Sequence, residues 1–108
     1  MAFYEEKISE FIRKSASEFL AREAGRNSLI TVTHVTMGDN AQYATIYVSV
    51  LPESAEKSAL DFLKRKRSEF KHYVKNHSRI GHIPFFDFEI DIGAKNSNRI
   101  NELSQTEL

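Results

Sequence analysis

The sequence predicts an α+β domain of two layers, with helices packed on one face of a three-stranded sheet in the order α-β-β-α-α-β. Helical apolar spacing at the start of the chain, two strand-like segments joined by a turn signal, and a clear alternating strand after a long helical stretch support this prediction. The 108 residues are enough for one hydrophobic core and too few for two. We expect the domain to cover residues 1–95 and a short tail to cover 96–108.

The first element is predicted to be an amphipathic helix from residue 3 to about residue 24. Its inward side is marked by apolar and small side chains that recur every three or four residues, with charged residues between them. These are Tyr4, Ile8, Phe11, Ile12, Ser15, Phe19 and Leu20. Gly25 is expected to end the helix, because glycine readily adopts the left-handed conformation common just beyond a helix C-terminus.

An antiparallel β-hairpin is predicted next. Residues 29–37 are rich in Thr, Val and Ile, which favour strands, and Gly38, Asp39 and Asn40 form a strong turn signal. The following strand alternates between apolar and polar residues, and Pro52 is expected to end it. Its predicted core-facing residues are Ala44, Ile46, Val48 and Val50.

A long helical stretch is predicted after Ser54, which is expected to cap it. One apolar stripe runs along it and consists of Leu60, Leu63, Phe70 and Val74. Four consecutive cations precede Ser68, and the sequence leaves open whether the stretch is one continuous helix or kinks between Lys66 and Glu69. A kink there would rotate the second half of the stripe relative to the first.

The third strand is predicted over residues 86–92, where alternation is clearest. Its expected core-facing residues are Phe86, Phe88, Ile90 and Ile92, and its expected solvent-facing residues are Asp87, Glu89 and Asp91. We expect Phe88 to be buried between the sheet and the helices. Ile100 and Leu103, at helical spacing, predict a short docked turn near the end of the sequence.

Positive charge is concentrated in one part of the chain. Residues 57–82 contain eight Lys or Arg against two Asp or Glu, although the whole chain has 15 of each kind and no formal net charge. Segregated cations indicate an anionic partner such as RNA, because they gain affinity by releasing phosphate counterions. The predicted RNA-binding residues are Lys64, Arg65, Lys66, Arg67, Lys71, Lys75 and Arg79. In an unbroken helix, four of them would share one face: Lys64, Lys71, Lys75 and Arg79. The plainer interpretation is a solvated helix face.

The sequence offers little for catalysis. The absence of cysteine excludes thiol nucleophiles, disulfides and thiolate metal sites. The carboxylates of the third strand could hold a cation or place a general acid, but the ordinary explanation is the solvent side of an amphipathic strand. The histidines lack the three- or four-residue spacing with which a helix chelates a metal: His34, His72, His77 and His82. We expect no enzymatic activity, no metal and no cofactor.

Glycine-based phosphate loops are also missing from the sequence. The four glycines, Gly25, Gly38, Gly81 and Gly93, form neither a Walker loop, nor a dinucleotide fingerprint, nor the G-x-x-G clamp of ordinary KH domains. RNA binding would therefore depend on side-chain cations, with Tyr43, Tyr47 and Tyr73 available for stacking. The acidic start of the chain and the lack of long apolar runs lead us to expect a soluble, cytoplasmic protein.

Several blocks of the sequence resemble the ribosome-binding factor A family. Residues 31–35 and 44–51 resemble its hairpin, with the pattern A-x-V-Y-V-S-V, and residues 83–91 resemble its P-x-L-x-F-x-x-D strand. Pro84, Phe88 and Asp91 match the strand pattern. Ile100 and Leu103 match the apolar pair near the end of the family's sequence. The chain departs from the family at residues 25–27, where D-P-R is common, at 67–68, where a small residue and Gly are usual, and before Pro84, where Arg is usual.

The resemblance implies a type II KH-like domain without the G-x-x-G loop. It also implies a ribosome assembly factor that binds the immature small ribosomal subunit and its rRNA, assists late maturation and 5′-end processing, and has no enzymatic activity. We expect no membrane partner and a monomer in the free state. The alternative is a protein-interaction module of the same class, whose acidic strand faces a basic partner and whose basic helix only aids solubility.

Overall fold

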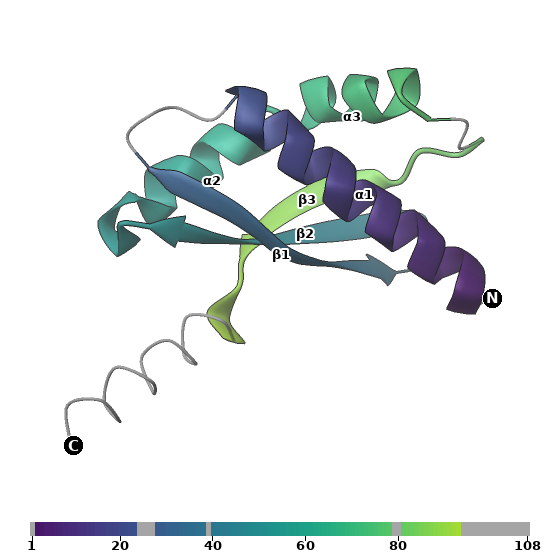
Figure 1. The fold of residues 1–108 in the computed structure, drawn as a ribbon, viewed down its shortest axis with the longest axis horizontal. Coiled ribbons are helices and arrows are strands. Elements are labelled where there is room, and N and C mark those ends of the chain that lie inside the picture. Colours follow the sequence, from purple (N-terminus) through teal and green to yellow (C-terminus); the bar gives the residue numbers. More distant parts are fainter. Residues whose placement is uncertain (1, 24–27, 39, 79–80, 94–108) are drawn as a thin grey trace.

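The computed structural model describes residues 2–23, 28–38, 40–78 and 81–93 and confirms the predicted element order (Figure 1). The elements are α1 (Ala2–Glu23), β1 (Leu29–Gly38), β2 (Tyr43–Leu51), a 3₁₀ turn η1 (Glu53–Ala55), α2 (Glu56–Arg65), α3 (Arg67–Asn76) and β3 (Phe85–Ile90). Three predictions fall outside the described residues: the helix end at Gly25, the docked turn with Ile100 and Leu103, and the tail at 96–108. No helix in the described part is both long and apolar enough to cross a membrane.

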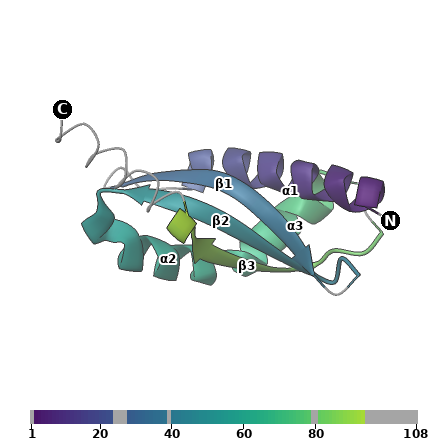
Figure 2. The ribbon, with the colours of Figure 1, turned by 90° about the horizontal axis from the view of Figure 1, so that it is seen from below.

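β2 is the central strand, and Figure 2 shows it between β1 and β3. β1 and β2 form the predicted antiparallel hairpin, and its turn is closed by a hydrogen bond from the Gln42 amide to the Gly38 carbonyl. β3 pairs with β2 in parallel and places Phe85 opposite Tyr43. The sheet is therefore mixed, and both outer strands are edges.

A β-bulge in β1 changes which residues face outward. Val32 pairs with buried Val48, but the register then shifts so that His34 pairs with Tyr47. The hydroxyl oxygen of Thr33, the extra residue, lies 3.2 Å from the Tyr47 carbonyl oxygen. Outward positions are thus odd-numbered before the bulge and even-numbered after it.

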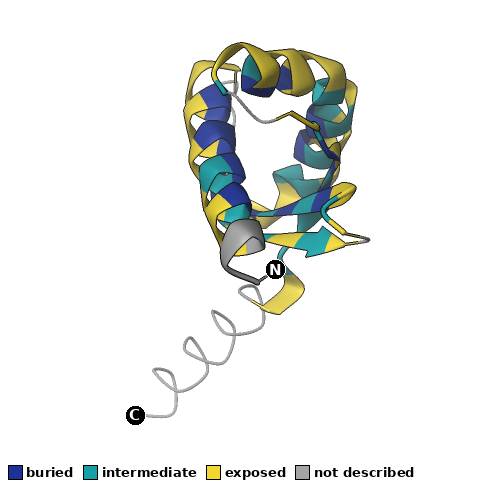
Figure 3. Ribbon diagram, turned by 90° about the vertical axis from the view of Figure 1, so that its right-hand side faces the viewer, coloured by how far each residue is buried: buried dark blue, intermediate teal, exposed yellow. Residues whose placement is uncertain are grey.

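The core lies between the helices and one face of the sheet, as the inward-facing buried residues in Figure 3 show. Phe70 of α3 is fully buried, and its ring centroid lies 5.3 Å from Phe19 of α1, 4.7 Å from Phe86 and 6.0 Å from Phe88. Phe88 is 0% exposed, which confirms its predicted burial. The predicted inward residues of β2 are also buried: Ala44, Ile46, Val48 and Val50.

Two local predictions about where elements begin and end are wrong. Ser54 does not cap a helix: it lies within η1, whose turn is closed by the Ala55 amide and the Pro52 carbonyl, and α2 begins only at Glu56. Ile92 is not in the core but 66% exposed, because β3 ends at Ile90. Alternation assigns a face to each residue of a strand, but it does not show where the backbone pairing stops.

Asp91 is not part of a solvated acidic face either. It follows β3, and its amide donates to the Val48 carbonyl at 2.8 Å. Its carboxylate accepts a hydrogen bond from the Thr33 hydroxyl at 2.6 Å and lies 3.2 Å from Nδ1 of His34. The residue therefore ties the end of β3 to the bulge of β1 across the sheet.

Candidate nucleic-acid interface

The sequence left open whether the long helical stretch is kinked, and the structure has a one-residue break at Lys66, between α2 and α3. Lys66 has φ of −91° and ψ of 3°, outside the helical range, and its amide bonds to the carbonyls of Phe62 and Leu63. Its own carbonyl accepts the amide of Phe70, which starts the hydrogen-bond ladder of α3. The break leaves both helices packed on the core through buried Leu63 and Phe70.

Two of the predicted RNA-binding cations neutralise the outward carboxylates of β3. Lys64 Nζ lies 3.5 Å from Asp87 Oδ1 and 3.7 Å from Glu89 Oε1, and Arg67 Nη1 lies 3.3 Å from Asp87 Oδ1. Arg67 also donates from Nε to the Lys64 carbonyl at 3.1 Å. The helix break is thereby attached to the edge of the sheet, and the continuous cationic face of an unbroken helix is not formed.

Lys66 is also paired. Its Nζ lies 3.6 Å from Glu23 Oε2 of α1 and 3.2 Å from Glu69 Oε2 of α3, and it sits 5.6 Å above the Phe62 ring. The contacts of Lys66 connect the break to α1, just as those of Lys64 and Arg67 connect it to β3. These three cations serve the fold whether or not they also contact a ligand.

The remaining described cations of the predicted set are free. Arg65, Lys71 and Lys75 are exposed, and none has a carboxylate of the described residues within 4.0 Å. Arg79 lies outside the described residues. We define the α3 face as its exposed residues at three- and four-residue spacing: Ser68, Lys71, His72 and Lys75.

All three candidate stacking tyrosines contact another ring within the protein. Tyr73 packs on His77 at 4.2 Å between ring centroids and donates a hydrogen bond to Glu18 at 3.1 Å. Desolvation and this hydrogen bond raise the pKa of Tyr73, so its phenol stays protonated. Tyr47 stacks on His34 at 4.4 Å. Tyr43 is 49% exposed and lines a groove together with Arg67 and Lys71.

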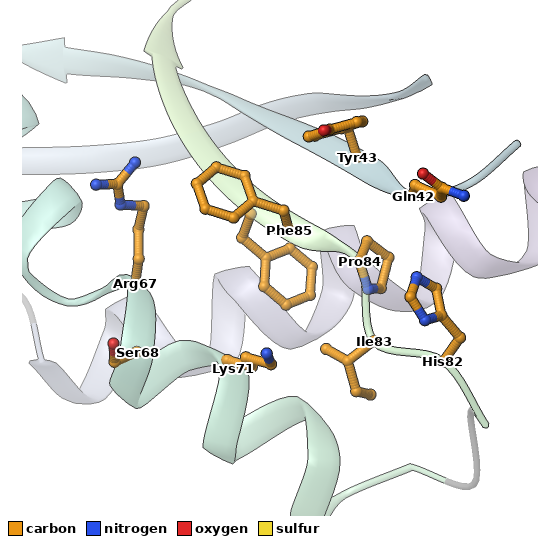
Figure 4. A pocket seen from close by; sticks show the side chains of 10 residues that line it. Gln42, Tyr43, Arg67, Ser68, Lys71, His82, Ile83, Pro84 and Phe85 are labelled. Atoms are coloured by element: carbon orange, nitrogen blue, oxygen red, sulfur yellow. The ribbon is translucent and has the colours of Figure 1, made fainter. Parts of the chain in front are cut away.

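An open groove of about 530 Å³ lies between the start of α3 and the starts of β2 and β3 (Figure 4). It is lined by Gln42, Tyr43, Arg67, Ser68, Lys71, His82, Ile83, Pro84, Phe85 and Phe86. The sequence-based prediction missed Phe85, because most phenylalanines were assigned to the core. The sequence did contain a signal for its exposure. Phe85 is two residues from Asp87 and four from Glu89, so it lies on the same outward face of the strand as these carboxylates.

The described residues contain no group of three or more His, Asp or Glu side chains arranged to hold a metal ion. What the site can do chemically therefore follows from its cations, hydroxyl, amide and aromatic rings. Such groups bind anions and planar rings. The chain is thus a small α+β domain with a broken helix pair, whose second helix presents a cationic face beside an aromatic groove.

A sequence profile of ribosome-binding factor A matches residues 4–104, and the chain belongs to this family. Ribosome-binding factor A of Fervidobacterium nodosum is 34% identical over 98 residues, covering 85% of this chain and 78% of the relative. That of Dictyoglomus thermophilum is 30% identical over 100 residues, covering 89% and 83%. The predicted family is therefore confirmed.

Solved structures share the fold. The crystal structure of ribosome-binding factor A from Thermus thermophilus gives a TM-score of 0.72 at 18% identity, covering 80% of this chain and 93% of that chain. A solution structure from Thermotoga maritima, described as a putative ribosome-binding factor A, gives 0.69 at 22% identity, covering 82% and 88%. At these identities the similarity establishes the architecture and leaves the site to be argued from this chain's own residues.

Proposed function

We propose that this protein binds the small ribosomal subunit before its maturation is complete and assists the late maturation and 5′-end processing of its rRNA. Membership of the ribosome-binding factor A family supports the ribosome as partner. A similar homology model of the Thermus thermophilus factor was fitted into the cryo-EM map of a complex of that factor with the 30S subunit. The contact is made by the α3 face, with Arg65 and Arg79 as further cations.

The observation that carries this proposal is the free state of Lys71 and Lys75. Both are exposed on one helix face without a described carboxylate partner, whereas Lys64, Lys66 and Arg67 are paired within the protein. A free cation gains more from a phosphate, because it has no ion pair to give up and releases a condensed counterion from the RNA. Such phosphate contacts fix position, while RNA shape supplies selectivity.

Assistance in maturation follows from differential binding. A protein that binds one RNA conformation more tightly than another shifts the population toward the first, by no more than the difference in its two affinities. A rigid cationic helix face matches only certain spacings of phosphates. The protein would therefore favour the rRNA conformation that presents those phosphates. We propose that this conformation is the substrate for 5′-end processing.

The alternative, a module whose acidic strand faces a basic protein, has less support. Asp87 and Glu89 are paired with Lys64 and Arg67 of the same chain. A basic partner would have to displace these internal pairs before it gained any of its own.

The test is sedimentation of the protein with ribosomal particles on a sucrose gradient. The wild-type protein is expected with free small subunits and not with complete ribosomes. Lys71→Glu/Lys75→Glu should remove it from the small-subunit fractions and cause precursor rRNA with an unprocessed 5′ end to accumulate. A wild-type protein found only at the top of the gradient would contradict the proposal.

A matched control reverses two exposed cations elsewhere, Lys14→Glu/Lys57→Glu, with the same change in net charge. Arg13 is a poorer choice, because it already hydrogen-bonds to Glu10 and this bond lowers the pKa of Glu10. Reversing Arg13 would therefore remove this hydrogen-bonded ion pair as well as change the net charge. Equal loss of subunit binding from both double variants would mean that bulk charge, and not the α3 face, carries recognition.

A further inference from the structure

The groove beside the α3 face presents an exposed aromatic ring. Phe85 is 57% exposed and lies on the outer face of β3, the side away from the core. Its ring meets that of Tyr43 edge to face, with centroids 6.1 Å apart and planes at 67°. In Figure 4 the Phe85 ring lies between Arg67 and Pro84, and Tyr43 lies above it. Two neighbouring exposed aromatic rings form a platform for another planar group.

The groove is also positively charged. Arg67 and Lys71 line it, its other polar side chains are Gln42, Ser68 and His82, and no carboxylate is among the residues that form it. The Arg67 guanidinium lies 5.5 Å from the centroid of the Phe85 ring. It is held there by Asp87 at 3.3 Å and by the Lys64 carbonyl at 3.1 Å, so little side-chain freedom remains to be lost on binding.

We propose that this groove binds one unpaired nucleotide of a single-stranded RNA segment, with the base stacked on Phe85 and the phosphate beside Lys71. The proposal rests on the function proposed above and specifies the form of RNA that the site accepts. The groove volume of about 530 Å³ falls within the range of small-ligand sites, about 300–1,000 Å³. Gln42 and His82, at the rim, carry groups that can hydrogen-bond to a base edge.

Single-stranded RNA fits these observations better than a duplex does. In a duplex the base faces are stacked on one another and cannot reach an aromatic side chain. A partner that offered only phosphates would not explain the exposed rings. A purely apolar partner would not explain Arg67 and Lys71. An unpaired nucleotide of RNA combines a free ring face with an adjacent anionic group, which matches both features of the groove.

The experiment measures fluorescence anisotropy of a labelled single-stranded oligoribonucleotide of about eight nucleotides, a typical site size for single-strand binders, and of a blunt RNA duplex of matching composition. The whole protein is used. Phe85→Leu keeps an apolar side chain of similar reach but removes the ring, and should weaken single-strand binding about fivefold or more. Phe85→Tyr restores the ring and should recover most of that loss. Leu51→Ala, a similarly exposed apolar residue at the other end of β2, is the control and should bind like the wild type.

Three outcomes would overturn the nucleotide site: no single-strand binding by the wild type, no effect of Phe85→Leu, or equal losses on single strand and duplex. The sedimentation experiment separates this failure from that of the proposed function. Wild-type protein that travels with small subunits but shows no ring-dependent oligonucleotide binding leaves the proposed function standing without this site. If the wild-type protein binds the oligonucleotide in a ring-dependent way but does not travel with small subunits, the nucleotide site stands and the proposed function does not.

Discussion

Neighbouring phenylalanines of β3 have opposite environments. Phe86 is 3% exposed and contacts the ring of Phe70, whereas Phe85 is 57% exposed and lies in the groove. Because successive strand residues face opposite sides of a sheet, one position separates a core residue from a binding residue. Residue type alone therefore says little about the role of an aromatic side chain in this chain.

We expect Phe88→Ala to lower the free energy of unfolding by about 3–5 kcal/mol, because it empties a fully buried site beside Phe70. Phe85→Ala, on the outer face of the same strand, should cost less than about 1 kcal/mol. Urea denaturation of both variants checks the prediction. A lower denaturation midpoint for Phe85→Ala than for Phe88→Ala would mean that the faces of β3 have been assigned the wrong way round.

The break between α2 and α3 divides one run of cations into groups with different roles. Lys64 and Arg67 turn to the carboxylates of β3, Lys66 turns to α1, and Lys71 and Lys75 remain free. A straight helix would present Lys64 and Lys71 on one side. The break therefore sets the size of the free cationic surface as well as the path of the chain.

Removing the paired cations should destabilise the fold more than removing the free ones. We expect Lys64→Ala/Arg67→Ala to cost about 1 kcal/mol, a small value because these ion pairs are partly exposed. Lys71→Ala/Lys75→Ala should stay within about 0.5 kcal/mol of the wild type. Thermal and urea denaturation measure both, at low salt and again at high salt, where the difference should shrink. Indistinguishable stabilities at low salt would argue that the pairs with Asp87 and Glu89 contribute nothing to the fold.

Over the whole molecule, a formal net charge of zero conceals separated charges. The excess of six cations over residues 57–82 is offset by acidic residues on both sides of that segment in the sequence. A neutral protein with one cationic face is drawn to RNA in a defined orientation, because the acidic parts are repelled while the cationic face is attracted. The same arrangement limits non-specific binding by the rest of the surface.

RNA affinity should fall linearly with salt on a double logarithmic plot, because each phosphate contact releases a counterion. For a single-stranded RNA, we expect Lys71→Ala/Lys75→Ala to reduce the steepness of that plot by about 1.4, at about 0.7 per lost contact. The Lys14→Ala/Lys57→Ala variant should leave it unchanged. Anisotropy titrations over a range of salt concentrations provide the slopes, and identical slopes for wild type and Lys71→Ala/Lys75→Ala would exclude these lysines as phosphate ligands.

Local patterns determined most of the architecture. Helical spacing located α1, and alternation located β2 with its buried residues, whereas the run of cations before Ser68 indicated a helix break only as one of two alternatives. The family, too, could be identified from short sequence blocks. Each of these features depends on the periodicity or composition of residues close together in the chain, so each is visible in the sequence.

The candidate site could be predicted only in part, for a physical reason. The segment that carries Lys71 and Lys75 was located from charge alone, but tertiary structure decided which cations remain free, because Asp87 and Glu89 reach Lys64 and Arg67 only when β3 lies beside α2. The register shift at Thr33, the end of β3 before Ile92 and the groove around Phe85 likewise depend on segments far apart in sequence. Local periodicity fixes which way a side chain faces within its own element, whereas pairing and enclosure depend on which elements meet.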